Sequence, residues 1–195
     1  MDLMDVSDVI AEVPEQVRLL RRSDFMALAE QGAFDDEDVE LLCGVVVVRE
    51  RPSPEHENAT SVIHRALLLQ LASRAEIRAN ASFAASQYSQ PRPDVLVVPL
   101  GNYWREHPVH AYLAVEVSKA SLRKDRGLKR RLYGISHVDE YWIVNVVDRE
   151  VEVYRNSVDG EFQNRTVHHP GELLRLVAFP DVTIAVTDIV PPAAD

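Results

Sequence analysis

The chain of 195 residues is 46% hydrophobic, which is enough for one domain with a substantial core. The plentiful aliphatic residues and only 7 glycines exclude a largely disordered chain, and the single cysteine excludes a disulfide framework. The net charge of −10 argues against a protein that coats nucleic acid regardless of sequence, but it does not exclude a nuclease, because a nuclease needs metal-binding carboxylates whatever its net charge.

Neither a membrane span nor a signal peptide is predicted. The apolar runs are all shorter than the roughly 18 residues that cross a bilayer, and the N-terminal residues 1–15 are acidic rather than positively charged. A single cysteine also fits a reducing compartment. We therefore expect a cytoplasmic protein with no membrane partner.

The N-terminal third alternates helix and strand. Residues 1–16 have weak periodicity and predict a loose arm, and we place the N-terminal arm at residues 1–21. Ser23-Asp24 predicts the cap of a short helix over 25–31, and the β-branched run 44–48 predicts a strand. After a proline-broken turn, the mostly apolar stripe of residues 58–74 predicts a second helix.

The middle of the chain is richer in strands. Residues 77–86, 94–98 and 112–118 predict three strands, the last two short and apolar. Residues 122–135 predict a helix with Ser121 as its N-cap. On this helix we expect the buried side to consist of Leu128, Leu132 and Ile135.

The C-terminal part predicts an antiparallel ending. Residues 140–147 and 150–155 predict two strands joined by a tight turn at Asp148-Arg149. The further strand-like segments are 161–169, 172–179 and 183–190. The order predicts a mixed α+β (α/β) domain over residues 22–190, with one central sheet, at least two covering helices and a tail at 191–195.

Common catalytic and nucleotide-binding motifs are absent from the sequence. It contains no Walker or dinucleotide-binding glycine pattern, no HExxH, no GxSxG and no paired cysteines. Cys43, between Leu42 and Gly44, is expected to be a small buried hydrophobe. Two charge runs, acidic at 35–40 and basic at 119–131, are typical of a solvated surface.

Two acids stand inside or beside apolar strands. Glu116 is flanked by aliphatic residues in LAVEVS, and Asp94 opens DVLVV directly after a proline. If these strands pair antiparallel, the two carboxylates meet at one edge of the sheet, where a shared divalent cation such as Mg²⁺ or Mn²⁺ would offset their repulsion. The alternative is that Glu116 points to solvent and Asp94 only caps a turn.

Several lysines could complete such a site. Lys119 follows Glu116 by three residues, so strand alternation sends it to the opposite face, and the position two after Glu116 is Ser118. Asp125, Lys129 and Tyr133 are spaced to share one helix face. A surface ion pair between Asp125 and Lys129 is the alternative interpretation of that spacing.

Taken together, these segments resemble the PD-(D/E)XK nuclease superfamily, and within it the Uma-two-type endonuclease family. The matching segments, in chain order, are VELLCG (39–44), SPEH (53–56), RPDVLVV (92–98), AVEVSKASLRKDRGLKRRLY (114–133), HVDEYWIVN (137–145) and VEVYR (151–155). Their order and spacing together cover roughly residues 22–190. The departures from the family pattern are Cys43 for Asp, Lys119 for an acid or Pro, and Asn145 for Asp.

The resemblance implies a restriction-endonuclease-like core and a metal site built from Glu40, Asp94 and Glu116. It also implies that the catalytic lysine has moved to the following helix, at Lys129. The implied activity is Mg²⁺- or Mn²⁺-dependent hydrolysis of DNA phosphodiester bonds. A basic face of the helix would then meet the DNA backbone; it consists of Arg123, Lys124, Arg126, Arg130 and Arg131.

Two other classes remain open from the sequence. One is an inactive nucleic-acid-binding or regulatory module on a nuclease fold. The other is a structural homodimer that pairs through a sheet edge at residues 140–147 and buries Tyr141 and Trp142. A homodimer is also compatible with the enzyme.

Overall fold

The computed structural model describes residues 18–193. The expected arm therefore lies outside the described residues except for 18–21, and the tail does so at 194–195. Among residues 18–193, no helix combines the length and the apolar character that crossing a membrane requires.

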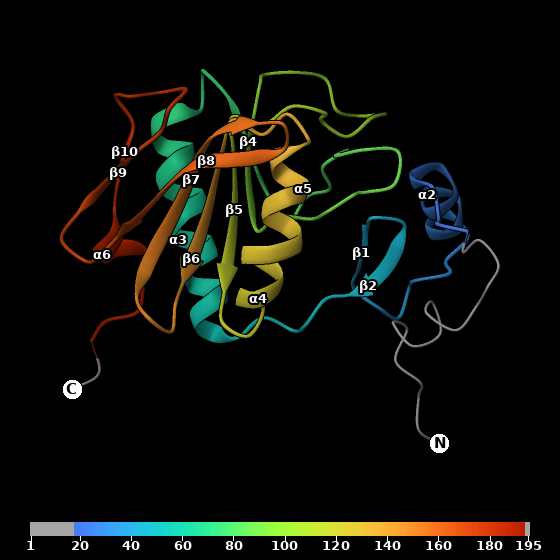
Figure 1. The fold of residues 1–195 in the computed structure, drawn as a ribbon, viewed down its shortest axis with the longest axis horizontal. Helices are drawn as coiled ribbons and strands as arrows, with labels where there is room; N and C mark the ends of the chain where they lie inside the picture. The colour runs from blue at the N-terminus through green and yellow to red at the C-terminus, as the bar shows by residue number, and fades with distance from the viewer. Residues whose placement is uncertain (1–17, 194–195) are drawn as a thin grey trace.

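The core is a mixed sheet of six strands in the order β3-β4-β5-β6-β7-β8. The strand bounds are β3 Glu76–Ala79, β4 Val95–Val98, β5 Leu113–Ser118, β6 Glu140–Asn145, β7 Glu150–Val158 and β8 Glu161–His168. All neighbours pair antiparallel except β5 and β6, which run parallel. The chain therefore crosses over between β5 and β6, and the crossover carries the helical segment after β5 (Figure 1).

Helices cover both faces of this sheet (Figure 1). Helix α3 (Pro54–Leu71) packs its apolar side on one face, where Ile63, Leu67 and Leu71 join the larger core cluster. A small C-terminal unit shares that cluster; it consists of β9 (Leu173–Arg175), β10 (Thr183–Ala185) and α6 (Val186–Ile189). The other face carries α4 (Leu122–Lys124), the π-helical turn η1 (Asp125–Lys129) and α5 (Arg130–Gly134).

The N-terminal elements lie beside the sheet rather than in it (Figure 1). Helix α2 (Arg22–Glu30) precedes a separate hairpin of β1 (Val39–Leu42) and β2 (Val45–Val48). The hairpin turn holds Cys43 at φ 51° and Gly44 at φ 82°. Two positive φ angles suit the tight turn between twisted strands, and a side chain at Gly44 would meet Leu19 Cβ at 2.5 Å.

Several predictions about single elements are wrong. Helix α2 begins at Arg22, and its N-cap, Arg21, makes no side-chain capping bond, so Ser23-Asp24 does not cap it. The strand expected over 77–86 ends at Ala79, because Asn80 turns the chain with φ 48°. Cys43 is exposed, since it occupies the hairpin turn.

Three further predictions fail in the C-terminal half of the chain. The segment 172–179 forms a strand only at Leu173–Arg175, and 183–190 forms a short strand followed by a helical turn. Strand β6 lies between β5 and β7, so it is not a free sheet edge. Tyr141 and Trp142 are each 0% exposed inside the two cores, and the proposed dimerisation through residues 140–147 is therefore wrong.

Candidate functional site

Asp94 and Glu116 face each other across two neighbouring strands. The register Val95↔Val115 places Asp94, the residue before β4, opposite Glu116 in β5. Both are buried, and the backbone N–H of Val117 donates to Asp94 Oδ2 at 2.7 Å. The antiparallel pairing expected from the sequence is therefore present, and Glu116 does not point to solvent.

Lys129 reaches Glu116 from the helical layer above the sheet. Its Nζ donates to Glu116 Oε1 at 2.9 Å, and the Tyr133 hydroxyl donates to the same oxygen at 2.6 Å. Lys129 is buried, so the alternative of a surface ion pair with Asp125 is wrong. Lys119 instead pairs with Glu55, with 3.1 Å between Nζ and Oε2.

The π-helical turn η1 explains why a polar helix face points inward. A π-turn widens the helix by one residue and shifts the side chains that follow it. As a result Asp125, Lys129 and Tyr133 are all buried, whereas Ile135 is 63% exposed and Leu128 is only partly buried. The predicted buried side of this helix is therefore correct at Leu132 alone. Ser121 precedes the helix but makes no capping bond to its backbone.

Glu40 joins the site from the separate β1–β2 hairpin. It is 0% exposed, and its carboxylate lies 3.2 Å from Lys129 Nζ and 3.3 Å from Lys124 Nζ. The backbone N–H of Arg92 donates to it at 3.3 Å. Lys129 thus lies between the carboxylates of Glu116 and Glu40 and links the hairpin to the sheet.

The buried charges shift one another's pKa values. Burial raises the pKa of the Glu116 carboxyl to about 8, against the opposing effect of Lys129 and with a further increase from Asp94. The carboxylates of Glu116 and Glu40 raise the pKa of Lys129 although burial lowers it, so this ammonium stays protonated. The pKa of Glu40 is lowered, because Lys129 and Lys124 outweigh its burial.

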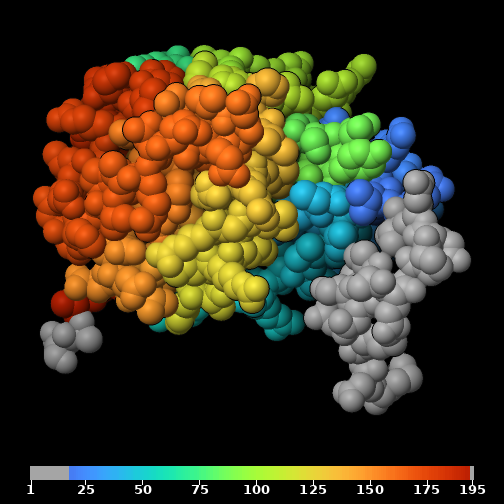
Figure 2. Space-filling model, viewed as in Figure 1, coloured from blue at the N-terminus to red at the C-terminus, as the bar shows by residue number. Residues whose placement is uncertain are grey.

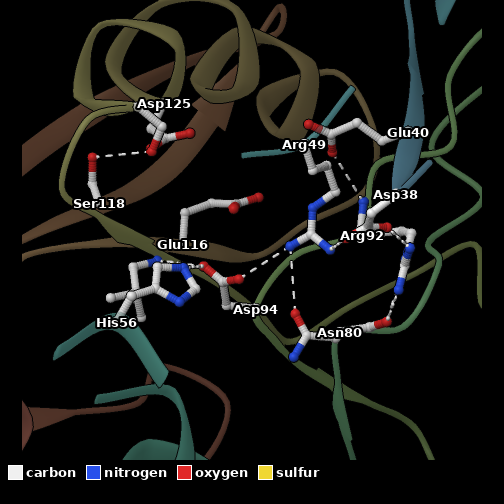
Figure 3. Close-up of polar contacts among 12 residues, drawn as sticks. Asp38, Glu40, Arg49, His56, Asn80, Arg92, Asp94, Glu116, Ser118 and Asp125 are labelled. Carbon is white, nitrogen blue, oxygen red and sulfur yellow. Dashed lines mark hydrogen bonds and ion pairs between the residues drawn. The ribbon is translucent and has the colours of Figure 1, made fainter. Parts of the chain in front are cut away.

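Asp94 has two further partners that the sequence reasoning did not identify. Arg49 Nη2 donates to Asp94 Oδ1 at 3.3 Å, and His56 Nε2 lies 3.0 Å from Asp94 Oδ2 (Figure 3). His56 sits in the first turn of α3, where Ser53 caps the helix and Pro54 occupies its first position. The Ser-Pro pair is a usual helix start, so this signal could have moved the predicted start from residue 58 to residue 54.

Asp125 is a fourth buried acid beside this cluster. Ser121 Oγ donates to its Oδ2 at 2.5 Å, whereas its buried Oδ1 has no hydrogen-bond partner among the described residues. Burial raises the pKa of the Asp125 carboxyl, although Lys129 opposes the shift. The acids of the site thus outnumber the lysines that lie between them.

Asp94, Glu116, Asp125 and Lys129 line one cleft with a volume of about 870 Å³, to which Arg49 and His56 also contribute. One wall is the segment 47–53, which runs from the end of β2 to the start of α3, and the other is the segment 119–131, which runs from the end of β5 through the helical layer. The surfaces of the two segments are close neighbours in Figure 2 (cyan and yellow). Arg51, Arg123, Lys124 and Arg131 supply cations along these walls. The predicted basic face is therefore only partly correct, because Arg126 pairs with Glu152 and Arg130 pairs with Glu161, away from the cleft.

Comparison with known proteins places the chain in a family. The profile of the Uma2 family, described as "Putative restriction endonuclease", matches residues 22–187. The chain belongs to the Uma2 family. No curated protein matches it.

A solved structure supports the Uma2 fold. It is the crystal structure of a "putative nuclease belonging to DUF820" from Anabaena variabilis, to which this Uma2 chain is similar with a TM-score of 0.71. The two are 15% identical, and the match covers 87% of this chain and 97% of the other. The expected mixed α+β fold and the expected family are thus confirmed.

The three departures from the Uma2 pattern lie outside the contacts of Glu116. Cys43 occupies the exposed hairpin turn, and Lys119 is exposed beside Glu55. Asn145 Oδ1 accepts from the backbone N–H groups of Val147 and Asp148 at 3.1 Å each, so the amide shapes the turn after β6.

Three of the buried acids in this Uma2 chain, Glu40, Asp94 and Glu116, contact basic side chains. Within residues 18–193, no group of three or more His, Cys, Asp or Glu side chains is arranged to hold a metal ion. Asp94 contacts Arg49 and His56, while Glu40 and Glu116 contact Lys129. The metal-binding and catalytic roles of Glu40, Asp94, Glu116 and Lys129 remain predictions.

Proposed function

We propose that the chain is a metal-dependent endonuclease that hydrolyses DNA phosphodiester bonds. The observation that carries the proposal is the facing pair of Asp94 and Glu116 in a cleft, with the Lys129 ammonium on Glu116. Membership of a nuclease family agrees with it.

The donor set fits a small, hard divalent cation. Mg²⁺ is usually bound by one or two carboxylates and completes its shell with water and substrate phosphate, so a ready-made cage of three side chains is not required. Asp94 and Glu116 would hold the Mg²⁺ or Mn²⁺ ion, with Glu40 as a further or water-mediated ligand. When bound, the ion would supply Lewis acidity toward a phosphoryl oxygen.

Lys129 would act as a charged hydrogen-bond donor. Since the two neighbouring carboxylates keep its ammonium protonated, it is unsuited to accept a proton from water. It can instead orient the attacking water or offset the negative charge that develops on the phosphate in the transition state. The cations on the cleft walls would contact the DNA backbone.

A nuclease assay on single-stranded, duplex and branched DNA with Mg²⁺ or Mn²⁺ tests the proposal. We expect the wild-type chain to cleave at least one of these forms and Asp94→Asn to abolish both cleavage and Mn²⁺ binding while the fold is kept. Cleavage by Asp94→Asn at the wild-type rate would contradict the assignment of Asp94.

The alternative is an inactive nucleic-acid-binding or regulatory module. The observation that favours it is that each candidate metal ligand already forms an ion pair within the protein, Asp94 with Arg49 and both glutamates with Lys129. Calorimetric titration with Mn²⁺ separates the two, because the module would bind DNA without binding the metal. A homodimer remains a prediction for either function.

A further inference from the structure

Arg49 is the cation closest to the candidate metal site that no family motif includes. It follows β2 directly, its side chain is 14% exposed, and it lines the same cleft as Asp94 and Glu116. Figure 3 shows its guanidinium between Asp94 and Asn80. A largely buried guanidinium needs charged or hydrogen-bonding partners to offset its loss of hydration. The partners of Arg49 therefore determine which other groups it can bind.

The contacts of Arg49 are unequal. Nη1 donates to Asp38 Oδ2 at 3.1 Å, whereas Nη2 is shared between Asp94 Oδ1 at 3.3 Å and Asn80 Oδ1 at 3.4 Å. The longer bonds of Nη2 are near the end of the hydrogen-bond range. Arg49 can therefore lose Asp94 and still be held by Asp38.

Asp94 does not depend on Arg49 for its position. Its other oxygen, Oδ2, accepts from the backbone N–H of Val117 in β5 at 2.7 Å, and His56 Nε2 lies 3.0 Å from the same oxygen. Oδ1 is thus presented to the cleft whether or not Arg49 contacts it. A guanidinium and a divalent cation compete for one oxygen that stays in place.

We propose that Arg49 occupies the divalent-cation position on Asp94 Oδ1 and, once displaced, binds a phosphate oxygen of the DNA in the same cleft. The inference rests on the proposed function and assigns Arg49 as a substrate-binding residue of that site. The planar guanidinium suits this exchange, because it binds carboxylate and phosphate with the same fork of N–H donors.

The matched variants are Arg49→Gln and Arg92→Gln in the full chain. Each replaces one arginine by an uncharged side chain that still donates hydrogen bonds. Arg92 pairs with Asp38 and with the backbone carbonyl of Asn80, so it shares two partner residues with Arg49 but contacts neither oxygen of Asp94. The pair therefore separates the loss of one positive charge from the loss of the Asp94 contact.

Calorimetric titration with Mn²⁺, without DNA, measures the competition. We expect Arg49→Gln to bind Mn²⁺ about tenfold more tightly than the wild-type chain and Arg92→Gln to stay within about twofold of it. Unchanged Mn²⁺ affinity in Arg49→Gln would overturn the competition for Asp94. Far-ultraviolet circular dichroism and a thermal melt in EDTA show whether each variant is folded, and Arg49→Lys serves as the second variant, with an affinity expected between the other two.

A DNA-binding titration tests the second step, in which the displaced Arg49 contacts a phosphate oxygen. With Ca²⁺ as the divalent cation, since it also takes oxygen ligands, we expect Arg49→Gln to bind duplex DNA at least fivefold more weakly than Arg92→Gln. Equal DNA affinity of the two variants would overturn the phosphate contact. If neither the wild-type chain nor Arg49→Gln binds Mn²⁺, both the proposed function and this inference are wrong. If both bind Mn²⁺ with equal affinity, only this inference is wrong.

Discussion

Glu116 is a buried acid whose charge is offset by hydrogen bonds from neighbouring side chains. Its carboxyl is buried between sheet and helix, and both of its hydrogen-bond donors, from Lys129 and Tyr133, reach the same oxygen. Burial raises its pKa from 4.5 to about 8. Without a divalent cation, this carboxyl therefore takes up a proton at a higher pH than an ordinary glutamate, against the opposing effect of Lys129.

The first prediction concerns stability against pH in EDTA. Between pH about 4.5 and about 8 the folded chain keeps the proton on Glu116 while the unfolded chain releases it, so the free energy of unfolding falls as pH rises. We would measure the free energy of unfolding in urea at pH 5.5 and at pH 8.5. From the lower to the higher pH, the wild-type chain should lose more stability than Glu116→Gln does. Glu55→Gln is the control, because a carboxyl with a pKa of about 2 is ionised across this window. The prediction would be contradicted if the difference in free energy of unfolding between the wild-type chain and Glu116→Gln were the same at both pH values.

The second prediction concerns the lysine on the helical layer. Lys129→Ala should lower nuclease turnover about 100-fold and change Mn²⁺ affinity far less, because a group that orients water or offsets charge acts mainly in the transition state. Lys119→Ala should have little effect, since Lys119 is exposed and pairs with Glu55. Single-turnover kinetics and Mn²⁺ titration give the two numbers. Loss of activity with Lys119 and survival without Lys129 would reverse the assignment.

At the scale of elements, the π-helical turn is what brings acids and lysine together. It contains Gly127, which lines the cleft and around which an added Cβ would meet no atom within 4 Å. Packing therefore does not require a glycine here. Its presence in a helix interior costs about 1 kcal/mol relative to alanine, which indicates that the open space has another use.

The third prediction is that Gly127→Ala separates stability from binding. The fold should gain about 0.5–1 kcal/mol, because alanine restricts the unfolded chain and favours the helix. DNA affinity should fall, because the methyl group enters the cleft. Chemical denaturation and a DNA-binding titration on the same variant measure both. A variant that is more stable and binds DNA as wild type would show that the substrate does not approach this turn.

The elements also show where sequence reasoning succeeds. The strands around Asp94 and Glu116 were predictable, because apolar runs that hold a single acid are distinctive and two short strands leave few pairings. The helical spacing predicted that Asp125, Lys129 and Tyr133 share one face, but not that this face points inward, because the apolar residues of a helix are ordinarily the ones expected on its buried side. The strand that carries Glu40 was hidden by the run of four acids at 35–38 directly before it, and only the family resemblance pointed to this residue.

At the scale of the whole molecule, charge is distributed unevenly. The net charge is −10, yet cations line both walls of the cleft. An acidic protein with a basic cleft repels DNA in general and attracts it at one place. The affinity for DNA should therefore depend on a small number of phosphate contacts.

The fourth prediction follows from that distribution. Arg131 lines the cleft, whereas its neighbour Arg130 pairs with Glu161. Arg131→Ala should weaken duplex binding and reduce the slope of log affinity against log salt by about 1, and Arg130→Ala should leave the slope as it is. Binding titrations from 50 to about 200 mM salt measure the slopes. Equal slopes in the two variants would place the DNA elsewhere.

The order of the whole sheet was only partly open to prediction. A mixed sheet with covering helices follows from the alternation of the segments, but which strands lie at its edges does not. Residues 140–147 look like an exposed partner surface in the sequence because they are so apolar, and the same property fits a central strand that is buried on both faces. Whether such a segment is an exposed surface or a central strand depends on which strands pair with it. The local sequence pattern does not specify that pairing.

The exposed position of Cys43 has a practical consequence. It is the only cysteine in the chain, and it sits at the turn of the hairpin that carries Glu40 and leads into Arg49. A spin label or fluorophore attached to this thiol would report on the hairpin without any cysteine being added or removed. The label would then report on the hairpin as Mn²⁺ and DNA are added in turn, and the end of that hairpin lines the cleft at Val47 and Val48.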